Sequence, residues 1–149
     1  MNVRILIAVE NSAVRKAMKA YLESRPGWAV VAEAVNEGEA LEKSIEHLPD
    51  VLVLDTMMAE QAGRRLIRQV RFKVSRVEVL MVSYDESPFA IREALNAGAR
   101  GFVFKVDLVR DLFPAIEAVA RHEKFVSGRR SGFPVQAFRA KTGDGKSAR

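Results

Sequence analysis

The sequence predicts an α/β protein whose five parallel strands form a doubly wound sheet in the order 2-1-3-4-5. Short apolar runs alternate five times with amphipathic helical patterns along the chain. The first run, residues 3–9, is apolar on both faces, as a buried parallel strand is. Its 149 residues, 48% of them hydrophobic, suffice for one domain with its own core. Right-handed crossovers then place helices on both faces of the sheet.

The predicted strands are short apolar runs that stop at polar or turn-forming residues. The first is rich in Val, Ile and Leu, and the third ends abruptly at Asp55. Each run spans four to seven residues. The five predicted strands are residues 3–9, 28–34, 51–54, 77–82 and 101–104.

The helices between the strands repeat apolar residues at three- and four-residue spacing and have recognisable ends. Asn11 or Ser12 supplies the first N-cap, Pro88 occupies the first turn of the fourth helix, and Gly98 closes that helix. The predicted helices run from the Asn11–Ser12 cap to Pro26, and over 37–47, about 60–72, 88–98 and about 107–123. The third presents four arginines to solvent: Arg64, Arg65, Arg68 and Arg71.

The net charge of +5 is concentrated near the C-terminus. Residues 121–149 hold eight basic and two acidic side chains, so the remaining 120 residues carry a net charge of −1. Beyond Val126 the composition is rich in Gly, Ser and basic residues and cannot bury enough apolar area to fold alone. We therefore expect a globular domain over 1–126 and a basic, flexible C-terminal extension over 127–149.

Composition excludes several other classes of protein. The chain has no cysteine, which excludes disulfide frameworks, thiolate zinc sites and thiol nucleophiles. Its first apolar run has five residues after Arg4, too few for a signal peptide or a membrane span. We expect a cytoplasmic protein that has no membrane partner.

Four polar side chains follow predicted strands: Glu10, Asp55, Ser83 and Lys105. The carboxyl ends of parallel strands share one edge of the sheet, and ligands bind where the strand order reverses, between strands one and three. Two carboxylates meeting there repel each other unless a cation lies between them, and Mg²⁺ prefers oxygen ligands. A carboxylate can also act as a nucleophile in phosphoryl transfer, with a hydroxyl and an ammonium contacting the phosphoryl oxygens.

The segments around these positions carry a family resemblance. Residues 55–63 read Asp-Thr-Met-Met-Ala-Glu-Gln-Ala-Gly, and residues 98–105 read Gly-Ala-Arg-Gly-Phe-Val-Phe-Lys. Over residues 3–126 the chain resembles the receiver domain of bacterial two-component response regulators. That family carries an Asp-x-x-Met-Pro-x-x-x-Gly segment, a Thr or Ser where Ser83 stands, and a Gly-Ala-x-Gly-Tyr/Phe-x-x-Lys segment. These three pieces occur in order in the chain, with Ala59 in place of the family's proline.

The resemblance implies a role for each site residue. Asp55 would accept a phosphoryl group from a histidine kinase or a phosphotransfer protein. Glu10, Asp55 and the backbone carbonyl of Met57 would bind Mg²⁺, while Ser83 and Lys105 would contact the phosphoryl group. The protein would be no enzyme beyond catalysing its own phosphotransfer and dephosphorylation.

The resemblance also implies how the signal leaves. Ser83 and Phe102 would form the switch, and phosphorylation would bias an equilibrium between two conformations. The face made by the fourth helix, fifth strand and fifth helix would change its protein contacts. A homodimer through this face is one arrangement that the resemblance allows.

One departure from the family pattern opens a second hypothesis. Receivers carry two acidic residues after the first strand, whereas this chain has Val9-Glu10. The alternative is a degenerate receiver that acts as a phosphorylation-independent interaction module. A haloacid-dehalogenase-like hydrolase with Asp55 as nucleophile is disfavoured, because that family has a second Asp where Met57 stands.

The segment over 118–127 resembles the join between receivers and a DNA-binding helix-turn-helix. Only 22 residues follow Ser127, and they lack helical apolar periodicity, so direct DNA binding by this chain is not expected. We expect either a stand-alone receiver or a shortened form of a transcription regulator.

Overall fold

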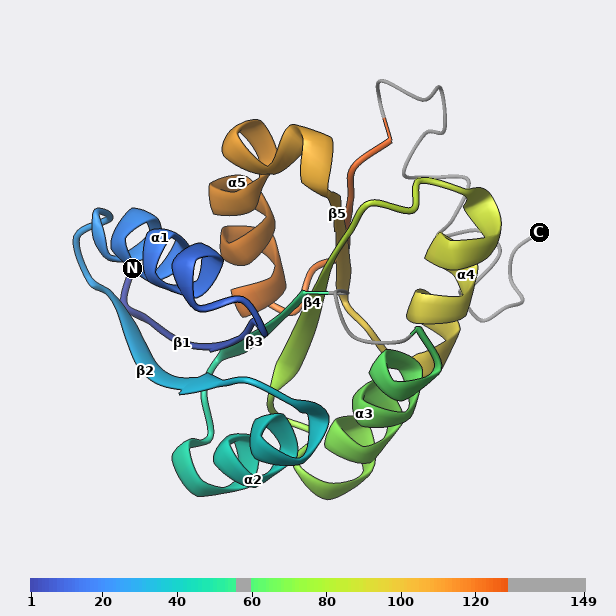
Figure 1. Ribbon diagram of the computed structural model, residues 1–149, viewed down its shortest axis with the longest axis horizontal. Helices are drawn as coiled ribbons and strands as arrows, with labels where there is room; N and C mark the ends of the chain where they lie inside the picture. The colour runs from blue at the N-terminus through green and yellow to red at the C-terminus, as the bar shows by residue number, and fades with distance from the viewer. Residues whose placement is uncertain (56–59, 129–149) are drawn as a thin grey trace.

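The computed structural model describes residues 1–55 and 60–128. Their strands form one parallel sheet in the order β2-β1-β3-β4-β5-β6, which confirms the predicted order of the first five (Figure 1). The observed bounds lie within one or two residues of the prediction. The strands are β1 (Val3–Ala8), β2 (Trp28–Ala34), β3 (Val51–Asp55), β4 (Glu78–Ser83), β5 (Gly101–Phe104) and β6 (Phe125–Val126).

Five α-helices and one 3₁₀ turn connect the described strands. Helices α1 and α5 cover one face of the sheet, and α2, α3 and α4 cover the other (Figure 1). In the part of the chain that the structure describes, no helix is both long and apolar enough to cross a membrane. The bounds are α1 (Ser12–Glu23), α2 (Glu37–His47), α3 (Glu60–Lys73), α4 (Pro88–Ala97), η1 (Lys105–Asp107) and α5 (Leu108–Ala120).

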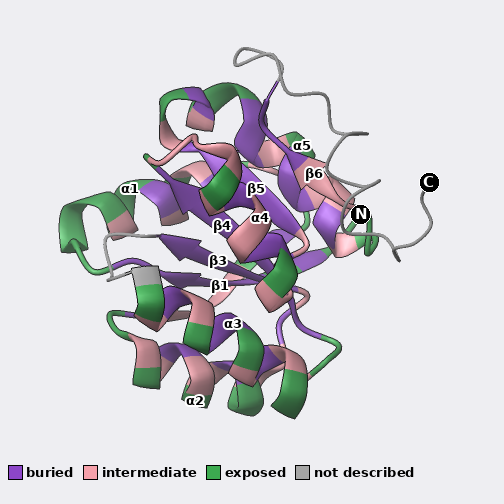
Figure 2. Ribbon diagram, turned by 90° about the vertical axis from the view of Figure 1, so that its right-hand side faces the viewer, coloured by how far each residue is buried: buried purple, intermediate pink, exposed green. Residues whose placement is uncertain are grey.

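The core consists of two apolar layers, one on each face of the sheet. Figure 2 shows buried strands between helices whose outer surfaces are exposed. In one layer Met18 of α1 and Leu112 of α5 pack against β1, β3 and β5, and in the other Leu66 of α3 and Ile91 of α4 do so. Burial of such side chains contributes about 1.5 to 3 kcal/mol each. This packing fixes the strand ends that carry the candidate site.

The chain after α5 departs from the prediction. The fifth helix was expected to reach residue 123, but α5 ends at Ala120 because His122 adopts a left-handed φ of 65°. The chain then forms β6, which the sequence did not predict and which pairs with β5. Ser127, assigned by composition to the extension, is buried and donates its amide to the Phe102 carbonyl at 2.9 Å. Residues 129–149 of the expected extension lie outside the described residues.

The third helix also corrects an expectation. Arg71 was expected to face solvent, but its guanidinium donates to the Val77 carbonyl at 2.8 Å and to Glu78 Oε1 at 3.0 Å. A glycine at position 98 makes room for it, because a Cβ there would lie 2.3 Å from Arg71 Cγ. Arg68 remains exposed, as expected.

Candidate functional site

The carboxylate of Asp55 is buried at the end of β3 and forms an ion pair with Lys105. The residue is 1% exposed, and Lys105 Nζ lies 2.7 Å from Asp55 Oδ1. Lys105 begins the 3₁₀ turn that follows β5, two strands away from β3. The parallel sheet therefore joins two residues that lie 50 positions apart in the sequence.

The strand between them, β4, ends at Ser83. Asp55 pairs with Val82, so Ser83 stands one residue beyond that rung at the same edge. The hydroxyl is buried and accepts a hydrogen bond from the Asp85 amide at 2.9 Å. The orientation of Ser83 is thereby linked to the loop that leads into α4.

Tyr84 completes this side of the site. Its side chain is exposed, and Lys105 Nζ lies 4.5 Å from the centre of its ring. The ammonium group thus lies close to both a carboxylate and an aromatic face, each of which attracts a cation. Tyr84 carried no signal in the sequence apart from its position directly after Ser83.

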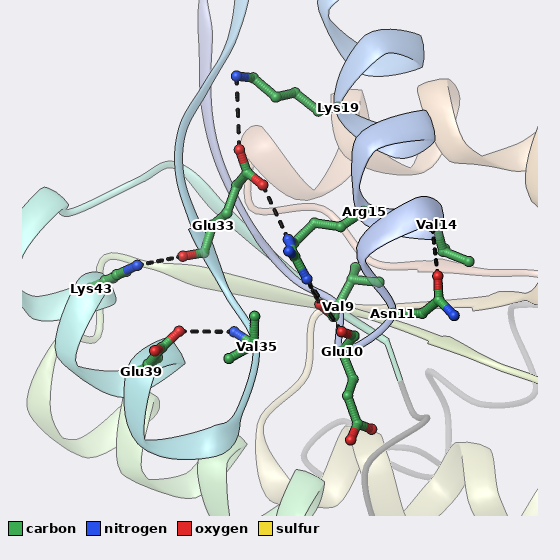
Figure 3. A network of polar contacts seen from close by, with 10 residues as sticks. All are labelled: Val9, Glu10, Asn11, Val14, Arg15, Lys19, Glu33, Val35, Glu39 and Lys43. Carbon is green, nitrogen blue, oxygen red and sulfur yellow. Dashed lines mark hydrogen bonds and ion pairs between the residues drawn. The ribbon is translucent and has the colours of Figure 1, made fainter.

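Glu10 reaches the same edge from the loop after β1. Ala8 pairs with Leu54, so the two residues after Ala8 lie beside the end of β3. Glu10 is exposed, and in Figure 3 its side chain extends away from Arg15 and Glu33. Val9, where the family places its first acid, is fully buried in the layer beneath α1 and α5. One exposed carboxylate therefore stands in this loop instead of two.

The donors at this edge fit a magnesium ion. Among the described residues no group of three or more His, Cys, Asp or Glu could hold a metal. Mg²⁺ nevertheless binds through one or two carboxylates, keeping several waters and adding phosphate oxygens. Asp55 at the end of β3 and Glu10 in the loop after the neighbouring strand β1 could supply two such carboxylates. The third expected ligand, the Met57 carbonyl, lies outside the described residues.

Phe102 occupies a core position on β5. It is 1% exposed and packs edge-to-face against Phe104, with ring centres 6.0 Å apart. Its carbonyl accepts the Ser127 amide, which connects β5 with the end of the described chain. The position is compatible with a switch aromatic, and that role stays a prediction.

Comparison with known proteins assigns the family. A family model for the response regulator receiver domain matches residues 5–117, so this chain belongs to the response-regulator receiver family. Receiver domains are the signalling modules of two-component systems. The fold and the polar strand ends described above agree with this assignment.

Individual relatives support the same family. The chain is 27% identical over 118 residues to the transcriptional regulatory protein YdfI of Bacillus subtilis, covering 79% of this chain and 55% of YdfI. It therefore spans a little over half the length of that relative. A LuxR-family two-component response regulator from Aurantimonas sp. SI85-9A1 matches with a TM-score of 0.82 and 30% identity, covering 88% of this chain and 94% of that one. The signal receiver domain of NarL from Mycobacterium tuberculosis matches with a TM-score of 0.69 and 28% identity, covering 78% and 97%.

Proposed function

We propose that this receiver accepts a phosphoryl group on Asp55, from a histidine kinase or a phosphotransfer protein, and then changes its protein contacts. The observation that carries the proposal is the buried Asp55–Lys105 ion pair, 2.7 Å long, at the carboxyl edge of a parallel sheet. A buried carboxylate with a movable ammonium beside it combines a nucleophile with a counter-ion for the incoming phosphate.

In the proposed reaction a carboxylate oxygen of Asp55 attacks the phosphorus of a phosphohistidine. The P–N bond of the donor breaks, the imidazole leaves with a proton, and an acyl phosphate forms. Asp55, Glu10 and the Met57 carbonyl would hold Mg²⁺, which would supply positive charge to offset the phosphoryl oxygens. Lys105 exchanges its contact with the carboxylate for one with a phosphoryl oxygen.

The Ser83 hydroxyl couples this chemistry to the surface. Before transfer it accepts the Asp85 amide, and after transfer it donates to a phosphoryl oxygen, which requires the hydroxyl to turn. That movement disturbs the loop into α4, and Phe102 then adjusts its packing. The signal leaves through the face of α4, β5 and α5. A second copy or an effector would contact this face, where the two-residue strand β6 extends the sheet beyond β5.

A second function competes, and one observation favours it. The position of the first acid is filled by the fully buried Val9, which cannot bind a metal-bound water. A receiver with a weakened cation site could serve as an interaction module that needs no phosphate. The two functions differ in whether Asp55 reacts.

Intact mass spectrometry after incubation with Mg²⁺ and phosphoramidate tests the proposal. Phosphoramidate carries the same P–N bond as phosphohistidine. We expect the wild type to gain the mass of one phosphoryl group and Asp55→Asn to gain none. Asp50→Asn is the matched control, because Asp50 lies at the opposite edge of the sheet, where it accepts the Arg4 amide. No gain in a folded wild-type sample would favour the phosphate-independent module.

A further inference from the structure

Arg15 reaches from the start of α1 back over the loop that carries Glu10. Its Nη1 donates to the Val9 carbonyl at 2.9 Å and lies 3.2 Å from the Glu10 carbonyl. The Arg15 side chain is only 17% exposed, so water competes little for these bonds. Figure 3 shows the guanidinium between the loop and Glu33. Two consecutive backbone groups of the loop are thus held by one side chain.

Glu33 braces this arginine from β2. Its Oε1 accepts Arg15 Nε at 3.2 Å, and its own carbonyl accepts Lys43 Nζ from α2 at 2.6 Å. The guanidinium is planar and rigid, so bonds at both of its ends fix the distance between β2 and the loop. Lys19, one turn further along α1, approaches the other oxygen of Glu33 at 3.7 Å but makes no contact with the loop.

We call these contacts of Arg15 with Glu33 and with the Val9 and Glu10 carbonyls the brace. The brace matters because the loop has a single carboxylate. Val9 is buried, so any side-chain ligand from the loop must come from Glu10, whose reach is set by its backbone. Asn11 secures the loop on the helix side, where its side chain accepts the Val14 amide at 2.9 Å. The carbonyls of Val9 and Glu10 have Arg15 as their side-chain donor.

We propose that Arg15, braced by Glu33, is a positioning residue that holds the Val9–Glu10 backbone so that Glu10 reaches the cation site beside Asp55. The proposal rests on the proposed phospho-receiver function, because it assumes that Glu10 helps to bind Mg²⁺. It adds a residue that touches neither the metal nor the phosphoryl group. Groups that orient metal ligands contribute strongly to metal affinity even without contact with the metal.

Two measurements test the proposal on the full chain. Amide hydrogen exchange without Mg²⁺ reports on the loop through the Val9 amide, which bonds the Ala34 carbonyl at 3.0 Å. Calorimetric titration with MgCl₂ reports the Kd. In Arg15→Ala we expect the Val9 amide to exchange about tenfold faster. We expect the Mg²⁺ Kd to rise about tenfold, which is the lower end of the range for removing a group that orients a metal ligand.

Three further variants separate positioning from general stability. Glu33→Ala removes the brace and should change both readouts in the same direction as Arg15→Ala. Glu33→Gln keeps an oxygen acceptor for Arg15 Nε and should restore most of the affinity. Lys19→Ala removes a cation from the same glutamate without touching the loop and should match the wild type.

The outcomes distinguish this proposal from the one on which it rests. Wild-type Mg²⁺ binding with an unchanged Kd in a folded Arg15→Ala variant overturns the positioning role alone. An equal loss of affinity in Lys19→Ala also overturns it, because charge near Glu33 would then be the cause. A wild type that neither binds Mg²⁺ nor gains a phosphoryl group removes both proposals.

Discussion

Two carboxylates, Asp55 and Glu78, are each 1% exposed, yet they lie at opposite ends of the neighbouring strands β3 and β4. Asp55 forms an ion pair with Lys105 at the edge where the exposed Glu10 and Tyr84 also lie. Glu78 instead contacts three side chains from three different segments. These are Arg71 at 3.0 Å, Arg100 at 3.2 Å and His122 at 2.5 Å.

The difference shows that burial of a carboxylate does not by itself indicate function. Burial tends to raise the pKa of Glu78, but hydrogen bonds from His122 and Arg100 and the charges of Arg100 and Arg71 together lower it below its ordinary value. The bonds tie α3, the turn before β5 and the turn after α5 to the start of β4. We infer that Glu78 stabilises the fold, whereas Asp55 stands where a ligand can replace its partner.

The largest expected effect comes from removing the charge of each carboxylate in turn. Glu78→Gln should lower the free energy of unfolding by about 2 to 3 kcal/mol, because partly buried arginines lose their counter-ion. Asp55→Asn should lower it by less, because it takes the counter-ion from Lys105, whereas Glu78→Gln takes it from both Arg71 and Arg100. Urea unfolding measures the free energy of unfolding of both variants. Equal decreases would contradict the claim that Glu78, unlike Asp55, mainly stabilises the fold.

A smaller effect is expected from the glycine that admits Arg71 to the Glu78 cluster. Gly98 has a φ of 121°, and a Cβ would lie 2.3 Å from Arg71 Cγ. Gly98→Ala should lower the free energy of unfolding by about 2 kcal/mol through backbone strain and the displaced arginine. Gly38→Ala in α2 is the matched control, since the added Cβ would lie 3.6 Å from Asn36 Oδ1 and the φ of Gly38 is not positive. A neutral result at Gly98 would show that Arg71 contributes little.

The Glu78 cluster also predicts a pH dependence of stability. Because the pKa of Glu78 is lowered by folding, its stabilising contribution is present above the ordinary value of 4.5 and is lost as the pH falls through the lower folded value. The stability difference between wild type and Glu78→Gln should shrink as the pH falls below about 4.5. Urea midpoints across this range measure it, and a difference that grows in acid would contradict the assignment.

The smallest effect is expected at the Asp55 edge. Tyr84→Ala removes the ring beneath Lys105 and should lower the free energy of unfolding by about 0.5 to 1 kcal/mol, while phosphoryl gain from phosphoramidate persists. Tyr84→Phe should match the wild type in urea unfolding, because the ring face rather than the hydroxyl meets the ammonium. A loss of stability in Tyr84→Phe would assign the effect to the hydroxyl.

Local sequence patterns predicted most of the fold. Apolar runs of four to seven residues and helical periodicity located the five main strands and the helices between them. Strand order followed from the right-handed connections and the choice of a doubly wound sheet. That order placed Asp55 and Lys105 at one edge, where the ion pair is found.

Long-range contacts explain what the sequence could not predict. The two residues of β6 carry no periodicity of their own and become a strand only because the edge of β5 accepts them. The helical pattern placed Arg71 among solvated arginines, but folding brings Glu78 beside it. No local pattern marked Glu33 as the partner of Arg15.

The sequence by itself determined the α/β class, the elements and the polar residues at the strand ends, because these depend on neighbours within a few positions. Only the tertiary structure decided which charges meet. Partners such as Glu78 and His122 lie 44 residues apart, and their pairing depends on packed helices and turns. Side-chain reach is set by that packing, so the brace on the Glu10 loop became visible only in three dimensions.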